Sequence, residues 1–415
     1  MKELTRRGFL RSIGLGSLTL PAWFPRLAFS AAPSPQRDVL VCVFLRGGAD
    51  GLNVVVPYAD EDYSTNRPLL GIRPPGRGGR RAIDLDGFFG FHPSLAPLKE
   101  LYDDGVLAAV HATGSPDRTH SHFDAMDFME RGTPGSKSIP TGWIGRHLAA
   151  LDTGNDSPFR GVGLGSLLPF SLRGSVPVTA LASIAGFHLN GRPGQEAESA
   201  RFQARLSALN GSDVWLDHQA LQTFAAVTTL AAAHPGTYKP GNGAVYPDSD
   251  FGSALRQVAQ LIKADLGVEV ACVDLAGWDT HAAQGGPTGA MADVASDLAD
   301  GLAAFHTDLL DRMSRITVVT MSEFGRRVHD NASGGTDHGH GNFMFLLGGA
   351  VKGRQVYGDW PGLAPDQLVG PGDLAITTDY RTVLAEVVER RLGNLKIGEV
   401  FPGFTPPGYL GVVRG

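Results

Sequence analysis

Four segments of this sequence place acidic or histidine side chains directly beside short, strand-like apolar runs. The runs are rich in β-branched residues, which is typical of buried strands. In open parallel α/β sheets, functional side chains gather beyond the carboxyl ends of the strands. The pattern therefore predicts a parallel sheet with a site at one edge. The segments are residues 39–45 before Asp50, 268–275 before Asp279 and His281, 316–321 before Glu323, and the loop 336–342 with Asp337, His338 and His340.

The loop 336–342 is the densest of these groups. Side chains alternate in an extended segment, so His338 and His340 are expected to project in the same direction and to meet one cation. Gly339 between them lets another part of the chain come close. The alternative is a loop whose polar groups only hydrogen-bond to one another. Each acidic residue that follows one of the other apolar runs could also, taken alone, be a turn former or an ion-pair partner rather than a metal ligand.

The first 32 residues have the features of a twin-arginine export signal. Arg6 and Arg7 precede a Phe-Leu pair, and a weakly apolar stretch follows at 13–23. That stretch is shorter than the ~20 apolar residues of a membrane span, and no later segment is long enough. We therefore expect the twin-arginine export machinery as a partner, a periplasmic or secreted location, and no stable membrane span. An uncleaved tail or membrane anchor is the alternative.

Charge and composition limit the other partners and the number of domains. The net charge is −6, and it becomes more negative without the basic leader, which argues against a nucleic-acid partner. Hydrophobic residues make up 42% of the chain, enough for one large core, so residues 33–415 are predicted to form a single domain. Cys42 and Cys272 lie inside apolar runs and are expected to be buried thiols, with a disulfide as the alternative.

Helical and strand-like patterns alternate along the chain in βαβ order. We therefore predict an α/β fold, a three-layer α/β/α sandwich with a mostly parallel sheet. The Ala-rich segment around 196–233 is predicted to be a helical insertion that covers the sheet, and the Gly-, Pro- and Arg-rich segment 67–81 an exposed loop. Further strands are expected at 106–111 and 343–347, and helices at 92–102, 252–266, 290–313 and 379–392.

A second polar cluster lies between a predicted strand and the start of a helix. Ser121 or Thr119 is the candidate nucleophile on phosphorus or sulfur, because a helix N-terminus attracts anions and a nearby metal suits an attacking hydroxyl. Ser121 is preferred. His120 and His122 are candidate catalytic groups, and the alternative makes them supporting donors and Ser121 a helix cap. Arg326 is a candidate clamp for anionic oxygens.

The candidate ligands are carboxylates and imidazoles without a thiolate. This set favours Zn, Mn or Fe over an all-oxygen Ca site. The number of candidates exceeds what one tetrahedral ion binds, so we expect one or two divalent ions, with zinc and manganese ranking first. The candidate metal ligands are Asp50, Asp279, His281, Glu323, Asp337, His338 and His340.

The motifs that carry these residues closely resemble, in the same order, the twin-arginine-exported domain-of-unknown-function family 1501. The likeness covers nearly the whole chain. That family is similar to the alkaline phosphatase and sulfatase superfamily, which implies an alkaline phosphatase-like α/β/α sandwich with metals at the carboxyl edge of the sheet. The motifs are Phe44–Asn53, Ser121–Asp124, Gly277–His281, Ser322–Arg326 and Asp337–His340.

The resemblance also implies ligand sets, from which this chain departs at one position. Relatives with two metals carry an Asp-His pair where this chain has Glu323 and Phe324, and a phenyl ring cannot ligate. The sequence also lacks the Cys-x-Pro-x-Arg motif of ordinary sulfatases. By the resemblance, one site would contain Asp279, His281 and either His338 or His340, and the other would contain Asp50, Glu323 and the nucleophile.

Two functions fit these observations. The leading hypothesis is an exported metal-dependent hydrolase of a phosphate or sulfate ester, or of a related anionic ester, either a small molecule or linked to a polymer. The rival is a non-catalytic exported protein that contains a metal and binds or assembles with another envelope protein. Phe324 and the unresolved nucleophile favour the rival, whereas the dense polar loops favour the enzyme.

Overall fold

Strand β1 (Val39–Leu45) lies within the central sheet in the computed structural model of the chain, and all its side chains are buried. They alternate between two hydrophobic cores, with Val41 and Val43 in one and Leu40 and Cys42 in the other. A strand buried on both faces requires helices on both faces. The structure describes residues 37–165, 167–184, 226, 229–230 and 238–415. The signal predicted at 1–32 and nearly all of the insertion predicted around 196–233 lie outside the described residues.

The described strands follow the order β11-β5-β10-β9-β1-β8-β6-β7, with β12 beside β5. β1 pairs in parallel with β8 and with β9, and β6 and β7 continue the parallel arrangement beyond β8. β10 runs antiparallel to both of its neighbours, β5 and β9. The predicted α/β fold with a mostly parallel sheet is therefore confirmed. The strands are β5 (Leu107–Gly114), β6 (Gly161–Leu164), β7 (Thr179–Leu181), β8 (Val270–Leu275), β9 (Ile316–Met321), β10 (Asn342–Leu347), β11 (Val356–Tyr357) and β12 (Thr378–Asp379).

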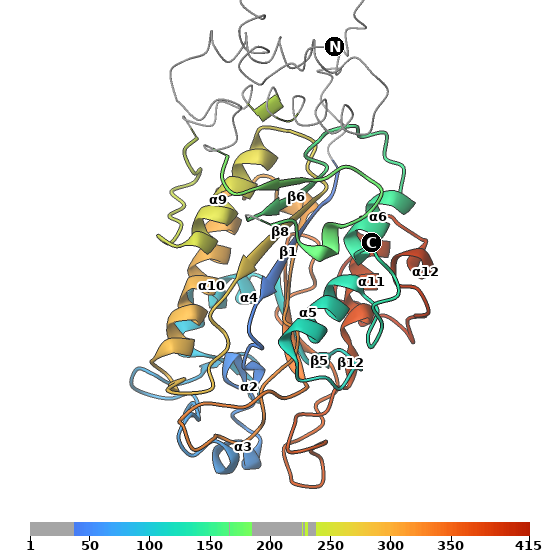
Figure 1. Ribbon diagram of the computed structural model, residues 1–415. Coiled ribbons are helices and arrows are strands. Elements are labelled where there is room, and N and C mark those ends of the chain that lie inside the picture. The colour runs from blue at the N-terminus through green and yellow to red at the C-terminus, as the bar shows by residue number, and fades with distance from the viewer. Residues whose placement is uncertain (1–36, 166, 185–225, 227–228, 231–237) are drawn as a thin grey trace, which may run out of the picture. The chain divides into compact units, whose positions relative to one another are not determined.

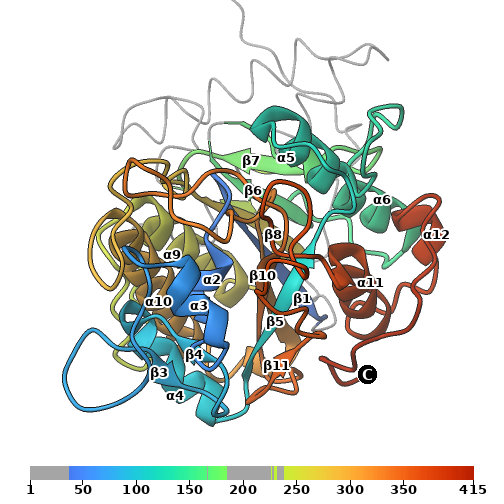
Figure 2. The same ribbon diagram turned by 90° about the horizontal axis from the view of Figure 1, so that it is seen from below.

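Helices cover both faces of this sheet and complete the three layers (Figure 1). One hydrophobic core joins the sheet to α4 (Ala96–Asp103), α9 (Asp250–Lys263) and α10 (Ala290–Asp308). The other core joins its opposite face to a second group of helices, and Figure 2 shows the two groups on either side of the strands. The second group is α5 (His122–Arg131), α6 (Trp143–Ala150), α11 (Tyr380–Arg390) and α12 (Ile397–Val400).

The reversed direction of β10 determines where polar loops meet. The loops that follow β1, β5, β8 and β9 leave the sheet at its carboxyl edge. Because β10 is antiparallel, the loop that precedes it reaches the same edge. The histidine-rich loop 336–342 is therefore brought beside the loops that carry the other candidate residues, at the edge that faces the viewer of Figure 2.

The loop predicted at 67–81 is mostly exposed, as expected, but Arg67, Leu70 and Ile72 at its start are buried. Arg67 pairs with the buried carboxylate of Asp50, and Ile72 packs in a hydrophobic cluster beside a small second sheet, which composition alone could not indicate. The elements around it are α2 (Gly51–Val54), β2 (Val55–Val56), α3 (Glu61–Asn66), β3 (Ile83–Asp84) and β4 (Gly90–Phe91), with β4 between β2 and β3.

The predicted bounds of several strands and helices agree closely with the structure. The strands predicted at 39–45 and 316–321 have those bounds, whereas the helix predicted at 290–313 ends at Asp308. Cys42 and Cys272 are adjacent across β1 and β8, and both are buried free thiols. None of the helices within the described residues has both the length and the hydropathy for a membrane crossing.

Candidate metal centre

Three imidazoles and one carboxylate converge at the carboxyl edge of the sheet. The Oδ1 atom of Asp279 lies 3.2 Å from Nε2 of His281, 3.4 Å from Nε2 of His338 and 3.5 Å from Nε2 of His122. Ligand atoms around one tetrahedral zinc ion are separated by about 3.3 Å, as follows from zinc–ligand bonds of about 2.0–2.1 Å. The ligand atoms of His122, Asp279 and His338 are all close to one another, and His281 adjoins this set through Asp279 and His338. We call these four residues the first group. His281 and Asp279 follow β8, His338 precedes β10, and His122 begins α5.

Each imidazole of the first group is oriented through its other nitrogen. Nδ1 of His122 lies 2.9 Å from Oε1 of Glu323, and Nδ1 of His338 lies 2.8 Å from the backbone carbonyl of His120. Nδ1 of His281 faces Oδ1 of Asp337 at 3.6 Å. An acceptor at Nδ1 fixes the proton there and leaves the Nε2 lone pair free, which is how metal-binding histidines are held. Glu323 and Asp337 thus contact the ligands of this group rather than its centre.

The proton positions of the first group fit a bound cation. Nε2 of His281 and Nε2 of His338 are 2.8 Å apart, so one must carry a proton in a neutral pair. His338 donates from Nδ1 to a carbonyl, and a proton on Nε2 of His281 would turn its Nδ1 lone pair toward the Asp337 carboxylate. Nε2 of His122 is buried and has no hydrogen-bond partner among the described residues. A divalent cation between these atoms would remove the conflict and satisfy the orphaned nitrogen.

The electrostatics of the first group keep its acidic groups ionised. Burial alone would raise the pKa of Glu323, but hydrogen bonds from His122 and from nearby backbone N–H groups hold it below its ordinary value. The hydrogen bond to Glu323 raises the pKa of His122 despite burial. Burial would likewise raise the pKa of Asp279, but the Arg326 guanidinium and the neighbouring imidazoles lower it. Ionised carboxylates are the form that binds or supports a metal.

A second group consists of His120, His340 and Asp373. Oδ2 of Asp373 lies 3.2 Å from Nε2 of His120 and 3.8 Å from Nδ1 of His340, and the two nitrogens are 3.4 Å apart. Asp373 was missed in the sequence, because it follows no strand and lies in a Gly- and Pro-containing turn that carries no ligand signal. Its position after Gly370-Pro371-Gly372 indicates only a turn.

The phenyl ring of Phe324 contacts both groups. Its centroid lies 4.8 Å from that of His122 and 4.6 Å from that of His338 in the first group, and 6.3 Å from that of His120 in the second. His338 and His340 were expected to meet one cation, but they belong to different groups. Gly339 between them packs on the backbone of Arg326, where a Cβ would come within 2.4 Å of a carbonyl carbon.

Asp50 joins neither group. Its carboxylate accepts two hydrogen bonds from Arg67, at 2.6 and 3.0 Å, and one from Gln284 at 2.6 Å. The side chains of Asp50 and Arg67 are 1% and 0% exposed. This buried bidentate pair ties the loop after β1 to the segment after α3.

Asp50→Ala is expected to lower the free energy of unfolding by about 3–5 kcal/mol, because it leaves the Arg67 guanidinium buried without its counter-charge. Metal bound per folded chain should not change. Urea unfolding with parallel metal analysis checks both statements, and Asp103→Ala, which removes an exposed ion pair with Lys99, is the matched control. Loss of metal from a folded Asp50→Ala protein would return Asp50 to the list of ligands.

Arg326 is 1% exposed and binds the protein's own backbone. Its guanidinium donates to the carbonyls of Gly47, Gly48, Trp278 and Thr336 and to Oδ1 of Asp279. These contacts join the loops after β1, β8 and β9. Most of its donors are therefore used within the protein, and few remain for the anionic oxygens that it was predicted to clamp.

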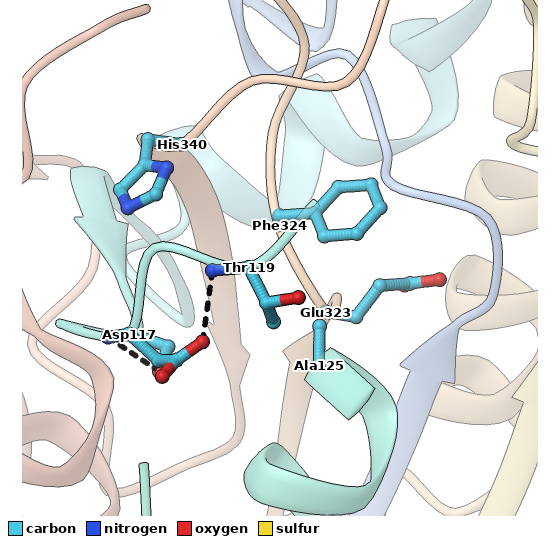
Figure 3. Close-up of a pocket in the computed structure, with 7 residues that line it drawn as sticks. Asp117, Thr119, Ala125, Glu323, Phe324 and His340 are labelled. Carbon is cyan, nitrogen blue, oxygen red and sulfur yellow. Dashed lines mark hydrogen bonds between the residues drawn. The ribbon is translucent and has the colours of Figure 1, made fainter. Parts of the chain in front are cut away.

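A small pocket lies beside the two groups, and Figure 3 shows the Thr119 side chain directed into it, near Glu323 and Phe324. Thr119 is held by a hydrogen bond from its backbone N–H to Asp117, at 2.8 Å. Its hydroxyl accepts a hydrogen bond from the backbone N–H of Ser121 at 3.2 Å. Ser121 precedes α5 at the N-cap position without a side-chain cap hydrogen bond, and it does not line this pocket.

The solved structures that this chain resembles are distant from it. The lipoteichoic acid synthase LtaP from Listeria monocytogenes is 10% identical, with a TM-score of 0.34 over 75% of this chain and 66% of that chain, just under two thirds of its length. The C-terminal periplasmic domain of EcEptC from Escherichia coli, in complex with Zn, is 10% identical, with a TM-score of 0.33 over 76% and 74%. Alkaline phosphatase from the Antarctic bacterium TAB5 is 11% identical, with a TM-score of 0.30 over 75% and 92%.

Among curated proteins, none matches the sequence. The family described as "Protein of unknown function (DUF1501)" matches residues 37–394, from two residues before β1 to a point beyond α11. The chain therefore belongs to the DUF1501 family, as its motifs predicted.

Proposed function

We propose that this protein is an exported metal-dependent hydrolase of phosphate or sulfate esters, or of a related anionic ester. The observation that carries the proposal is the first group, in which three Nε2 atoms and one carboxylate oxygen converge while acceptors face every Nδ1. A hydroxyl-bearing pocket lies next to it. A cation, oriented imidazoles and a nearby hydroxyl are the parts that ester hydrolysis at phosphorus or sulfur requires.

His122, Asp279, His281 and His338 would hold the ion, and zinc and manganese suit this set of nitrogen and oxygen donors. When bound, the ion would supply a Lewis acid that withdraws charge from an ester oxygen. Asp279 and His281 are 48% and 43% exposed at their side chains, so the group is open to solvent on their side. An anionic ester would approach from that side or through the Thr119 pocket.

The Thr119 hydroxyl is the proposed nucleophile, with Ser121 as the alternative. Its oxygen would attack phosphorus or sulfur, the ester oxygen would leave with a proton, and water would then release the acid from the enzyme. Thr119 is favoured because its side chain lines the pocket shared with Glu323 and Phe324, whereas the Ser121 side chain does not line it. The hydrogen bond from Ser121 N–H holds the Thr119 oxygen in place.

The test is a panel of chromogenic phosphate monoesters, phosphate diesters and sulfate esters. The purified protein should be metal-free at first and then supplied with zinc or manganese. We expect hydrolysis of at least one ester class that appears on metal addition and disappears with a chelator. Metallated protein that hydrolyses none of them would contradict the proposal.

That contrary result would support a second function, a non-catalytic exported protein that contains a metal and binds another envelope protein. Two observations favour it. The Phe324 ring occupies the space between the two groups, and the Arg326 donors are largely used by the backbone.

Export through the twin-arginine pathway is part of the proposal. Arg6→Lys combined with Arg7→Lys should leave the precursor in the cytoplasm, because the paired arginines of the signal are what the export machinery recognises. Immunoblots of periplasmic and cytoplasmic fractions measure this, with Arg11→Lys as the control in the same segment. Unchanged delivery of the double variant to the periplasm would contradict the proposed location.

A further inference from the structure

Asp373 is a buried carboxylate whose two oxygens are in unequal surroundings. Its side chain is 3% exposed, and Oδ2 is the oxygen that faces His120 and His340. Oδ1 has no hydrogen-bond partner among the described residues, and Arg327 Nε approaches it only to 3.9 Å. Burying a carboxylate that is incompletely paired is costly, so proteins retain such groups where a cation compensates them.

The geometry of the second group suits a cation. Its three donor atoms, Oδ2 of Asp373, Nε2 of His120 and Nδ1 of His340, are separated by 3.2, 3.4 and 3.8 Å. Atoms at these separations leave room for a point about 2 Å from each, which is the length of a zinc–nitrogen bond. The set of two imidazoles and one carboxylate is the one used by metal sites that keep positions open for water or substrate.

Each member of the second group is held in place by contacts outside it. The backbone of Asp373 exchanges hydrogen bonds with that of Val369 and forms a bridge with Arg327. The backbone carbonyl of His340 accepts a hydrogen bond from the backbone N–H of Gly325, at 3.0 Å. The backbone carbonyl of His120 accepts from His338, which links this residue to the first group. The donors are therefore positioned by the fold before any ion binds, which lowers the cost of binding.

We propose that His120, His340 and Asp373 bind a second divalent cation, zinc or manganese by its donor set, at a site separate from the first group. Phe324 lies between the two groups, so the ions would not share a side-chain ligand. His340 also lines the Thr119 pocket, which has room for about one water-sized group, so a single oxygen of an ester there would meet the open positions of this ion. That contribution to ester binding rests on the proposed function, whereas the binding of the ion does not.

The experiment counts ions. The purified full-length chain is equilibrated with zinc, freed of unbound metal and measured by mass spectrometry for metal per chain. Wild type should bind two ions. Asp373→Asn and His120→Asn should each keep the ion of the first group, and their affinity for the ion of the second group should be at least about 100-fold weaker. Asp279→Asn should also bind one. Asp366→Asn, at an exposed position in the loop that leads to Asp373, is the control and should bind two.

Cobalt substitution separates the two sites in the same variants. Asp279→Asn should retain the visible absorption bands of the second group, and Asp373→Asn those of the first, so the two spectra should sum to that of wild type. Two ions in folded Asp373→Asn and His120→Asn would overturn the proposal. The proposal would also be overturned if wild type bound a single ion and Asp373→Asn still bound it. Two ions without any ester hydrolysis would instead contradict the proposed function and leave this site intact.

Discussion

His281→Ala is expected to weaken binding of a divalent ion by the first group by more than about 100-fold, since loss of a supporting contact alone costs about 10- to 100-fold. His281 is the informative position because its side chain is 43% exposed and makes few contacts outside the group. Its removal should therefore affect the ion more than the apoprotein. Equilibrium dialysis with zinc and with manganese measures the affinity directly.

The same change should appear in thermal stability. With free metal at about 100 times Kd, an ion that binds only the folded state stabilises it by about 2.7 kcal/mol. Binding that is 100-fold weaker leaves about 0.4 kcal/mol under the same conditions. The rise in Tm on metal addition should therefore nearly disappear in His281→Ala.

His329→Ala is the matched control, since His329 is an exposed histidine in the segment that follows β9. It should retain the affinity and the stabilisation of wild type. If His281→Ala and Asp279→Asn both bind the ion as wild type does, the ion is not held by the first group. A lower Tm of the metal-free variant would separately report a structural role for the side chain.

Strands could be predicted from the sequence where an apolar run with clear ends was enough to define them. β1 and β9 are uniform apolar runs with clear ends, and their predicted bounds hold. The direction of β10 could not be predicted, because the apolar run 343–347 is buried on both faces and contains nothing that distinguishes parallel from antiparallel pairing. That direction nevertheless brings the loop 336–342 to the site.

The candidate site was predictable as a set of loops but not as groups of ligands. Asp279, His281 and His338 do converge, whereas His340 joins His120 and Asp373 instead. The roles of Asp50 and Glu323 depend on partners that are distant along the chain. Asp50 pairs with Arg67, 17 residues away, and Glu323 binds His122, 201 residues away. Spacing along the chain carries no signal of either contact.

The Phe324 ring affects both a bound cation and the access of a substrate. Its ring packs against His122 and His338 and also against His120, so it fills the space between the first and second groups with an apolar surface. Such a ring excludes water from the imidazoles on both sides, which strengthens their interactions with a bound cation or an anionic ester. The same ring limits the room for the proposed ester, which would have to approach from the exposed side of Asp279 and His281 or beside Thr119.

Thr119→Val is expected to lower kcat for the best ester by at least about a thousandfold, because valine keeps the shape of threonine and removes the proposed attacking oxygen. Metal content should not change, since Thr119 belongs to neither group. The variant also loses the hydrogen bond from Ser121 N–H, which contributes about 1 kcal/mol to stability. Initial rates, metal analysis and melting of the same preparation distinguish lost chemistry from lost folding.

Ser121→Ala is the matched comparison, because Ser121 lies two residues away at the start of α5 and makes no side-chain cap hydrogen bond. It should retain most of the activity, the metal and the Tm of wild type. The reverse result, with Ser121→Ala inactive and Thr119→Val active, would assign the nucleophile to Ser121. Full activity of both variants would show that neither hydroxyl attacks the ester. Hydrolysis would then have to proceed by direct attack of water, without a covalent intermediate on either side chain.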